Sequence, residues 1–282
     1  MFYQQTISRK GEISGIGLHT GIMITLFIIP LKEDSGILFK RSDLFTKNII
    51  TAKFFNVSNT NLCTEISNKH GAKISTIEHI MAALWAMKID NVLIEVSGPE
   101  VPIVDGSSKA FIELIKESGI KVQSKKRNYL KIIKTVKVNI KDKELTIKSS
   151  ENFKISFNIN FKNKAVGYQQ YSLCNPMQFE KEISHARTFG FLNDIAYLRN
   201  NGMAKGASLK NSIGIDKNGI INTEGLRYTN EFVRHKILDC IGDLFLSGYQ
   251  IIGNIEGSKA GHCLNNRILK EIFNNPDTYS II

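Results

Sequence analysis

The segment from Asn230 to Gly248, NEFVRHKILDCIGDLFLSG, places three polar groups at helical spacing within an apolar stretch. His235, Asp239 and Asp243 follow one another at intervals of four residues, so on a helix they project from one side, one turn above the next. A buried imidazole or carboxylate is costly unless a partner compensates it. The pattern by itself fits a satisfied polar network, a solvated face, or a set of ligands for a cation.

A second polar group occurs in the first half of the chain, in ISTIEHIMAAL at 74–84, where Glu78 and His79 are adjacent. With His235 and Asp239 they supply two imidazoles, one carboxylate ligand and one spare carboxylate. A catalytic zinc typically keeps three protein ligands and leaves a position open for water, whose proton a neighbouring carboxylate could accept. The H-E-x-x-H signature of many metalloproteases is absent, and the Glu–His pair alone also fits a helix surface.

Two further segments carry groups that could take part in such chemistry. GSKAGH at 257–262 places Lys259 and His262 on a glycine-punctuated turn, where a protonated His262 oriented by Asp243 would make a general acid. A histidine in a loop also fits an ordinary surface position. ISHARTFGFLNDI at 183–195, which could equally be a helix followed by a core turn, combines His185, Arg187 and Thr188 with Phe189 and Phe191.

The elements that must position these groups follow the same order in both halves of the chain. Apolar or alternating runs predict strands at 22–29, 35–41, 91–98, within 130–161 and at 249–257. Helical patterns cover 73–89, 108–119, 181–202, 230–248 and about 260–273.

This order predicts an α+β protein of two domains with related topology, arising from an internal duplication. We place the domains at 1–122 and 130–282, with a linker at 123–129. His79 and His235 then lie in the penultimate helix of each half. If the halves pack face to face, the two helices meet at the interface, which is a common place for a site.

Composition limits the classes of function. The 282 residues include 37 basic and 26 acidic side chains, a net charge of +11, which could indicate a nucleic-acid, anionic-membrane or phosphorylated partner. The lysines rarely cluster, except in SKKR at 124–127, so a basic nucleic-acid module is disfavoured. The longest apolar run, at 24–31, is too short to span a bilayer. The four cysteines show no metal or disulfide spacing, which favours reduced thiols and a cytoplasmic protein.

Six motifs together resemble the bacterial UDP-3-O-acyl-N-acetylglucosamine deacetylases, zinc enzymes of lipid A synthesis. The resemblance runs in order from about residue 3 to 274 and is carried by GIGLHTG at 15–21, ISTIEHIMAAL at 74–84, GPEVPIVDGSS at 98–108, HARTFGF at 185–191, EFVRHKILDCIGDL at 231–244 and GSKAGH at 257–262. It implies one Zn²⁺ per chain, for which Fe²⁺ could substitute in the cell.

The resemblance also implies roles for individual residues. The zinc ligands would be His79, His235 and Asp239. The catalytic groups would be the base Glu78, the acid His262, its carboxylate partner Asp243, and Thr188, whose hydroxyl stabilises the oxyanion. Substrate contacts would come from Lys236 and Lys259 near the sugar and diphosphate, Phe161 on the uracil ring, and Phe189, Phe191 and Leu18 elsewhere in the pocket.

The implied fold is two α/β-sandwich domains, each with a small insert, and an active site at their interface. The second insert, about 192–216, would form the passage for an acyl chain, although it contains the polar residues Lys205, Lys210 and Asn211. We expect an acylated UDP-amino-sugar as substrate, no nucleic-acid partner, no stable membrane insertion and a monomer. A different acylated amino sugar remains an alternative substrate.

Overall fold

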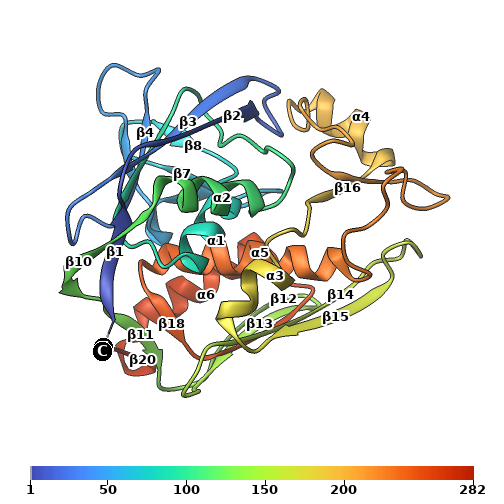
Figure 1. Ribbon diagram of the computed structural model, residues 1–282. Helices are drawn as coiled ribbons and strands as arrows, with labels where there is room; N and C mark the ends of the chain where they lie inside the picture. The colour runs from blue at the N-terminus through green and yellow to red at the C-terminus, as the bar shows by residue number, and fades with distance from the viewer. Residues whose placement is uncertain (1) are drawn as a thin grey trace.

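Two five-stranded sheets form the outer layers of the protein, whose computed structural model describes residues 2–282 (Figure 1). The first sheet consists, in spatial order, of β2 (Gly11–Ile16), β3 (Met23–Pro30), β9 (Val92–Val96), β4 (Ile37–Arg41) and β5 (Ile49–Thr51). The second consists of β12 (Val136–Ile140), β13 (Lys143–Lys148), β19 (Asn254–Ser258), β14 (Lys154–Asn160) and β15 (Tyr168–Leu173).

The two sheets share one strand order and one pairing pattern. In each, a single neighbouring pair is parallel, β4 with β9 and β14 with β19, while the other neighbours are antiparallel. The predicted α+β class is confirmed, whereas the duplication and the domain boundaries stay predictions. Residues 123–126 of the expected linker belong to a strand, β10 (Ile120–Lys126), which pairs with β1 (Tyr3–Ile7).

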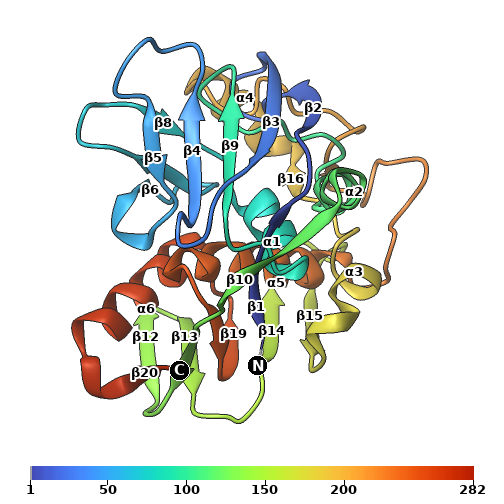
Figure 2. The same cartoon turned by 60° about the vertical axis from the view of Figure 1, so that its left-hand side comes forward.

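Helices fill the space between the two sheets (Figures 1 and 2). The first half contributes α1 (Glu78–Ala86) and α2 (Lys109–Ser118), and the second contributes α5 (Glu231–Leu244) and α6 (His262–Asn274). Two further helices, α3 (Phe179–Glu182) and α4 (Leu192–Asn200), lie between these groups in sequence. Within residues 2–282 no helix combines the length and the apolar character needed to cross a membrane.

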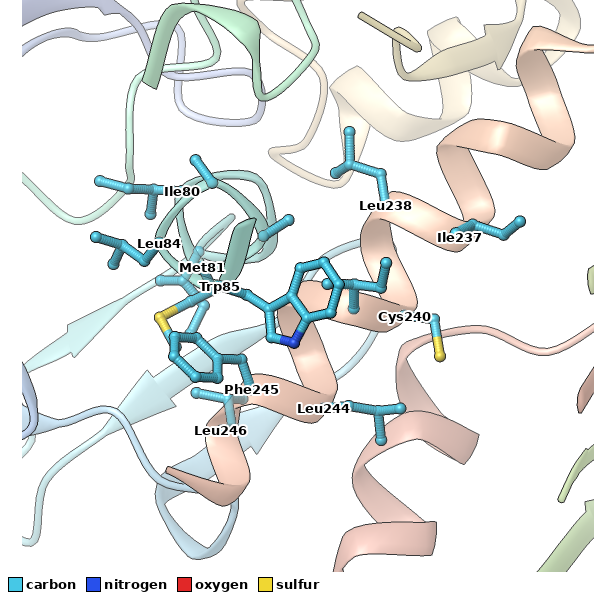
Figure 3. Packing of buried hydrophobic residues seen from close by; sticks show 14 of the residues in the cluster. Ile80, Met81, Leu84, Trp85, Ile237, Leu238, Cys240, Leu244, Phe245 and Leu246 are labelled. Carbon is cyan, nitrogen blue, oxygen red and sulfur yellow. The ribbon is translucent and has the colours of Figure 1, made fainter. Parts of the chain in front are cut away.

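The central contact is between α1 and α5, and it is apolar over most of its length (Figure 3). Residues 78–85 of α1 are all buried, as expected for a helix whose apolar residues surround its axis. Gly242 permits a close approach on α5, because a Cβ there would lie 2.0 Å from the Glu78 carbonyl oxygen. The expected meeting of the two penultimate helices is therefore confirmed, with Glu78 at the crossing.

Smaller sheets extend this framework. One contains β6 (Val57–Asn59), β7 (Glu65–Ser67) and β8 (Lys73–Ile74), and another pairs β16 (Phe189–Phe191) with β17 (Ile213–Ile215) in parallel. A third contains β18 (Gln250–Ile252), β11 (Tyr129–Ile132) and β20 (Tyr279–Ile281). Short 3₁₀ turns occupy Phe54–Asn56, Pro176–Gln178, Phe245–Ser247 and Pro276–Thr278.

The predicted ranges of two helices and one strand were wrong. The helix expected over 73–89 begins only at Glu78, because residues 73–74 pair with β7. The helix expected over 181–202 is interrupted by β16, which is held by its pairing with the distant β17. The strand expected over 249–257 divides at Gly253 into β18 and β19, which belong to different sheets.

Candidate active site and metal centre

Three buried side chains at the α1–α5 crossing converge on one point. His79 comes from α1, and His235 and Asp239 come from consecutive turns of α5. The Nε2 atoms of His79 and His235 lie 3.6 and 3.3 Å from Asp239 Oδ1. The three ligand atoms lie within 4.8 Å of one another. This arrangement could hold a divalent metal ion.

Asp239 supplies a direct test of whether these residues fit a metal. Its Oδ1 is buried and has no hydrogen-bond partner within residues 2–282, whereas its Oδ2 accepts from Lys236 Nζ at 2.5 Å. A buried carboxylate oxygen without a partner is costly. A cation between the two imidazoles and Asp239 would give this oxygen a partner. The three side chains therefore fit a metal ion.

The protonation of these groups suits ligation. Burial lowers the pKa of His235 to about 3, despite the nearby Asp239, so the ring is neutral. Burial opposes ionisation of Asp239, but the Lys236 ammonium, which donates to its Oδ2, holds the pKa of that carboxyl well below its ordinary value. A neutral imidazole and an ionised carboxylate are ligands that zinc accepts.

Glu78 lies beside this point, at the first turn of α1. Its Oε2 accepts from the backbone N–H of Thr64 at 3.1 Å, and its Oε1 lies 3.9 Å from Nε2 of His262. Burial raises the pKa of Glu78, an effect that His262 and His79 partly oppose. The carboxylate is therefore both fixed and a better proton acceptor than an exposed one.

His262 faces Glu78 from the start of α6. Its Nδ1 lies 2.7 Å from Asp243 Oδ2, which also accepts from Asn265 Nδ2 at 2.8 Å. Thr64 Oγ1 donates to the other oxygen of Asp243 at 2.6 Å. Burial alone would lower the pKa of His262, but the Asp243 carboxylate raises it to about 9. His262 is therefore a cation at neutral pH, as its expected role requires.

A cavity of about 970 Å³ opens from this polar cluster. Of the expected site residues, all but Asp243, which lies behind His262, line it. The set comprises Leu18, Glu78, His79, Phe161, Thr188, Phe189, Phe191, His235, Lys236, Asp239, Lys259 and His262.

The three phenylalanines form one aromatic cluster on the cavity wall. Phe161 lies 5.7 Å from both Phe189 and Phe191, measured between ring centroids. The backbone N–H of Lys259 donates to the Asn158 carbonyl of β14 at 2.9 Å, and its Nζ donates to Asp142 at 2.8 Å. The basic and aromatic groups expected to contact a substrate thus share one cavity, although Lys236 is engaged by Asp239.

The insert at 192–216 contributes a largely apolar wall to the same cavity. Its lining residues are Leu192, Asp194, Ile195, Leu198, Arg199, Ala204, Ala207, Ser208, Leu209, Ser212, Ile213 and Gly214. The polar residues Lys205, Lys210 and Asn211 do not line it. Gly214 leaves no spare room, because a Cβ there would lie 2.8 Å from Leu209 and Ile221 side-chain atoms.

The structure adds three residues to the predicted site. Thr64 contacts both Glu78 and Asp243, and Asn265 contacts Asp243. His19 lines the cavity with a buried Nε2 that has no partner within residues 2–282. Only Asn265 had a local signal, because it lies three residues after His262 on a predicted helix.

Comparison with known proteins places these observations in a family. A family model described as UDP-3-O-acyl N-acetylglycosamine deacetylase matches residues 4–274. Proteins named UDP-3-O-acyl-N-acetylglucosamine deacetylase from Citrifermentans bemidjiense and Geobacter sp. strain M21 are each 46% identical over 283 residues, spanning 100% of this chain and 92% of each relative. One of the same name from Shewanella frigidimarina is 41% identical over 285 residues, spanning 100% of this chain and 93% of its own. The chain therefore belongs to the UDP-3-O-acyl-N-acetylglucosamine deacetylase family.

Proposed function

We propose that this protein is a metal-dependent amidohydrolase that removes the N-acetyl group of UDP-3-O-acyl-N-acetylglucosamine, giving the free amine and acetate. The observation that carries the proposal is the buried convergence of His79, His235 and Asp239 on an unpartnered carboxylate oxygen, at the wall of a large cavity. The names of the relatives support the substrate. In this proposal the reaction is a cytoplasmic step of lipid A synthesis.

The three converging residues would hold Zn²⁺, or Fe²⁺ in its place. When bound there, the ion supplies a Lewis acid that polarises the amide carbonyl and makes water a stronger nucleophile. Lys236 keeps Oδ2 of Asp239 paired, which leaves Oδ1 as the oxygen available for ligation.

Glu78 is the general base in this proposal. Its carboxylate lies next to the ligand cluster, and the Thr64 N–H fixes one of its oxygens while the other faces the cavity side of His262. A raised pKa makes the carboxylate better matched to accepting a proton near neutral pH. Glu78 therefore takes a proton from the attacking water.

His262 is the general acid. Asp243 accepts from Nδ1–H, so the ring presents Nε2–H toward Glu78 and the cavity. With its pKa raised to about 9, the imidazolium is available to protonate the departing amine. Thr188 lines the same cavity, and its hydroxyl would donate to the oxyanion.

The remaining cavity wall would bind the substrate. The aromatic surface of Phe161, Phe189 and Phe191 offers stacking for a nucleobase, and Lys259 offers charge for a diphosphate. The apolar wall of the insert and Leu18 would hold the acyl chain.

The test is an acetate-release assay on UDP-3-O-acyl-N-acetylglucosamine, with the amine product identified by mass. The matched control is Glu78→Gln, which keeps the shape of the side chain and removes the base. We expect stoichiometric acetate and free amine from the native protein and a large loss with the variant. Release of acetate only from a different acylated amino sugar would reassign the substrate, and release of no acetate from either would refute the proposal.

A further inference from the structure

Three consecutive residues, 186–188, connect the candidate metal site to the cavity wall. The Ala186 carbonyl accepts from Nδ1 of His235 at 3.0 Å. Because a carbonyl can only accept, this contact places the proton on Nδ1 and leaves the lone pair of Nε2 facing Asp239. Thr188 lines the cavity, and its backbone bonds to Gly106 and Ile213, at 2.8 Å each.

The residue between them, Arg187, is tied to α5 by a buried ion pair. Its Nε donates to Glu231 Oε1 at 2.9 Å and its NH2 group to Oε2 at 3.2 Å, so the pair is bidentate. The Arg187 backbone N–H donates to the same Oε1 at 2.9 Å. The side chains of Arg187 and Glu231 are 2% and 0% exposed, so water cannot replace these contacts.

Further hydrogen bonds satisfy the rest of this pair. The Arg187 guanidinium also donates to the Gly225 carbonyl at 2.7 Å and to Glu224 at 2.8 Å. Glu231 Oε2 accepts from the backbone N–H of Arg227 at 2.6 Å. The carboxylate thus fixes the backbone at Arg187, between Ala186 and Thr188, and also at Arg227, rather than only neutralising a charge.

Glu231 lies one helical turn before His235, so the two side chains project from the same side of α5. We propose that Arg187 and Glu231 are positioning residues: they hold the Ala186 carbonyl against His235 and thereby orient a metal ligand. His79 has no comparable contact, since its Nδ1 is without a partner within residues 2–282. The inference rests on the metal site of the proposed function.

A purely structural ion pair elsewhere in the chain provides a matched control. Arg127, whose side chain is also 2% exposed, bonds Asp90 at 2.8 and 2.7 Å and the Lys88 carbonyl at 2.7 Å. None of these residues lines the cavity. Arg→Lys at either position keeps the charge and removes the planar fork, so both variants lose similar contacts.

The experiment measures Zn²⁺ affinity by chelator competition for the native protein, Arg187→Lys, Glu231→Gln and Arg127→Lys, together with each unfolding midpoint. We expect zinc binding weaker by about 10- to 100-fold for the first two variants, as for other groups that orient a ligand, and unchanged for Arg127→Lys. The d–d absorption bands of the Co²⁺-loaded protein should also change only in the first two, because they report ligand geometry.

A folded Arg187→Lys protein with native zinc affinity and native Co²⁺ bands would overturn the inference, as would an equal loss of affinity in Arg127→Lys. If Arg187→Lys does not fold, the isosteric Glu231→Gln decides in the same way. Failure of the native protein to bind zinc would instead refute the metal site, and the positioning role with it.

Discussion

Replacing Asp243 by Asn tests the contact that is expected to keep His262 charged. The two side chains are 2.7 Å apart, and the carboxylate overcomes the effect of burial to raise the pKa of His262 to about 9. Asn keeps the size of the side chain and loses the charge. Removing an opposite charge at this distance is expected to lower the pKa of His262 by about 1–3 units.

The size of the effect on stability follows from linkage. A pKa raised from 6.5 to about 9 corresponds to about 3 kcal/mol, at about 1.4 kcal/mol per unit. Because the folded pKa is above the unfolded one, this stabilisation is complete below pH 6.5 and is lost as the pH rises through about 9. The native protein should therefore be more stable than Asp243→Asn, and the difference in their unfolding free energies should be largest at low pH.

The assay is denaturant unfolding of both proteins after metal removal, at about pH 6 and about pH 10. We expect the difference in unfolding free energy to shrink at the higher pH, by up to about 3 kcal/mol. Asp43→Asn is the control, because Asp43 pairs with an arginine, Arg41, rather than with a histidine. A difference independent of pH, or an NMR titration placing the His262 pKa at or below 6.5, would refute the reasoning.

Three further outcomes follow from the geometry. Glu78→Ala should retain its metal, measured by elemental analysis, while its kcat falls by about 100-fold or more. A near-native kcat in this variant would exclude Glu78 as the base. The pH profile of kcat/KM should be bell-shaped, with an acidic limb from Glu78, whose pKa burial raises, and a fall near pH 9 as His262 loses its proton. A flat alkaline limb would reassign the acid. Shortening the acyl chain should lower kcat/KM by about fourfold per methylene. Ala207→Phe in the cavity wall should lower kcat/KM most for long-chain substrates, whereas Lys210→Phe outside the cavity should not. Equal kcat/KM for acylated and deacylated substrates would show that the insert binds no acyl chain.

Helical spacing made much of the site predictable. His235, Asp239 and Asp243 share one side of α5 because they are four residues apart, and the repeated order of elements placed His79 on the matching helix. Their burial also followed from the apolar residues around them. The closeness of the crossing did not follow, since it depends on the fit of Gly242 against Glu78.

Other parts depend on contacts between residues distant in sequence. Thr64 contacts Asp243 across 179 positions of the chain, and no local pattern indicates this. The strand β16 interrupts an expected helix only because β17 pairs with it. Local propensity is a weak guide where such tertiary pairing decides the conformation.

The most direct test of the central claim is reconstitution of the metal-stripped protein with Zn²⁺, following acetate release from UDP-3-O-acyl-N-acetylglucosamine. Activity should be absent without metal, return in proportion to added zinc up to one equivalent per chain, and not return in His235→Ala. Full activity in the stripped protein, or restoration of His235→Ala by the same equivalent of zinc, would contradict zinc-dependent catalysis at this site.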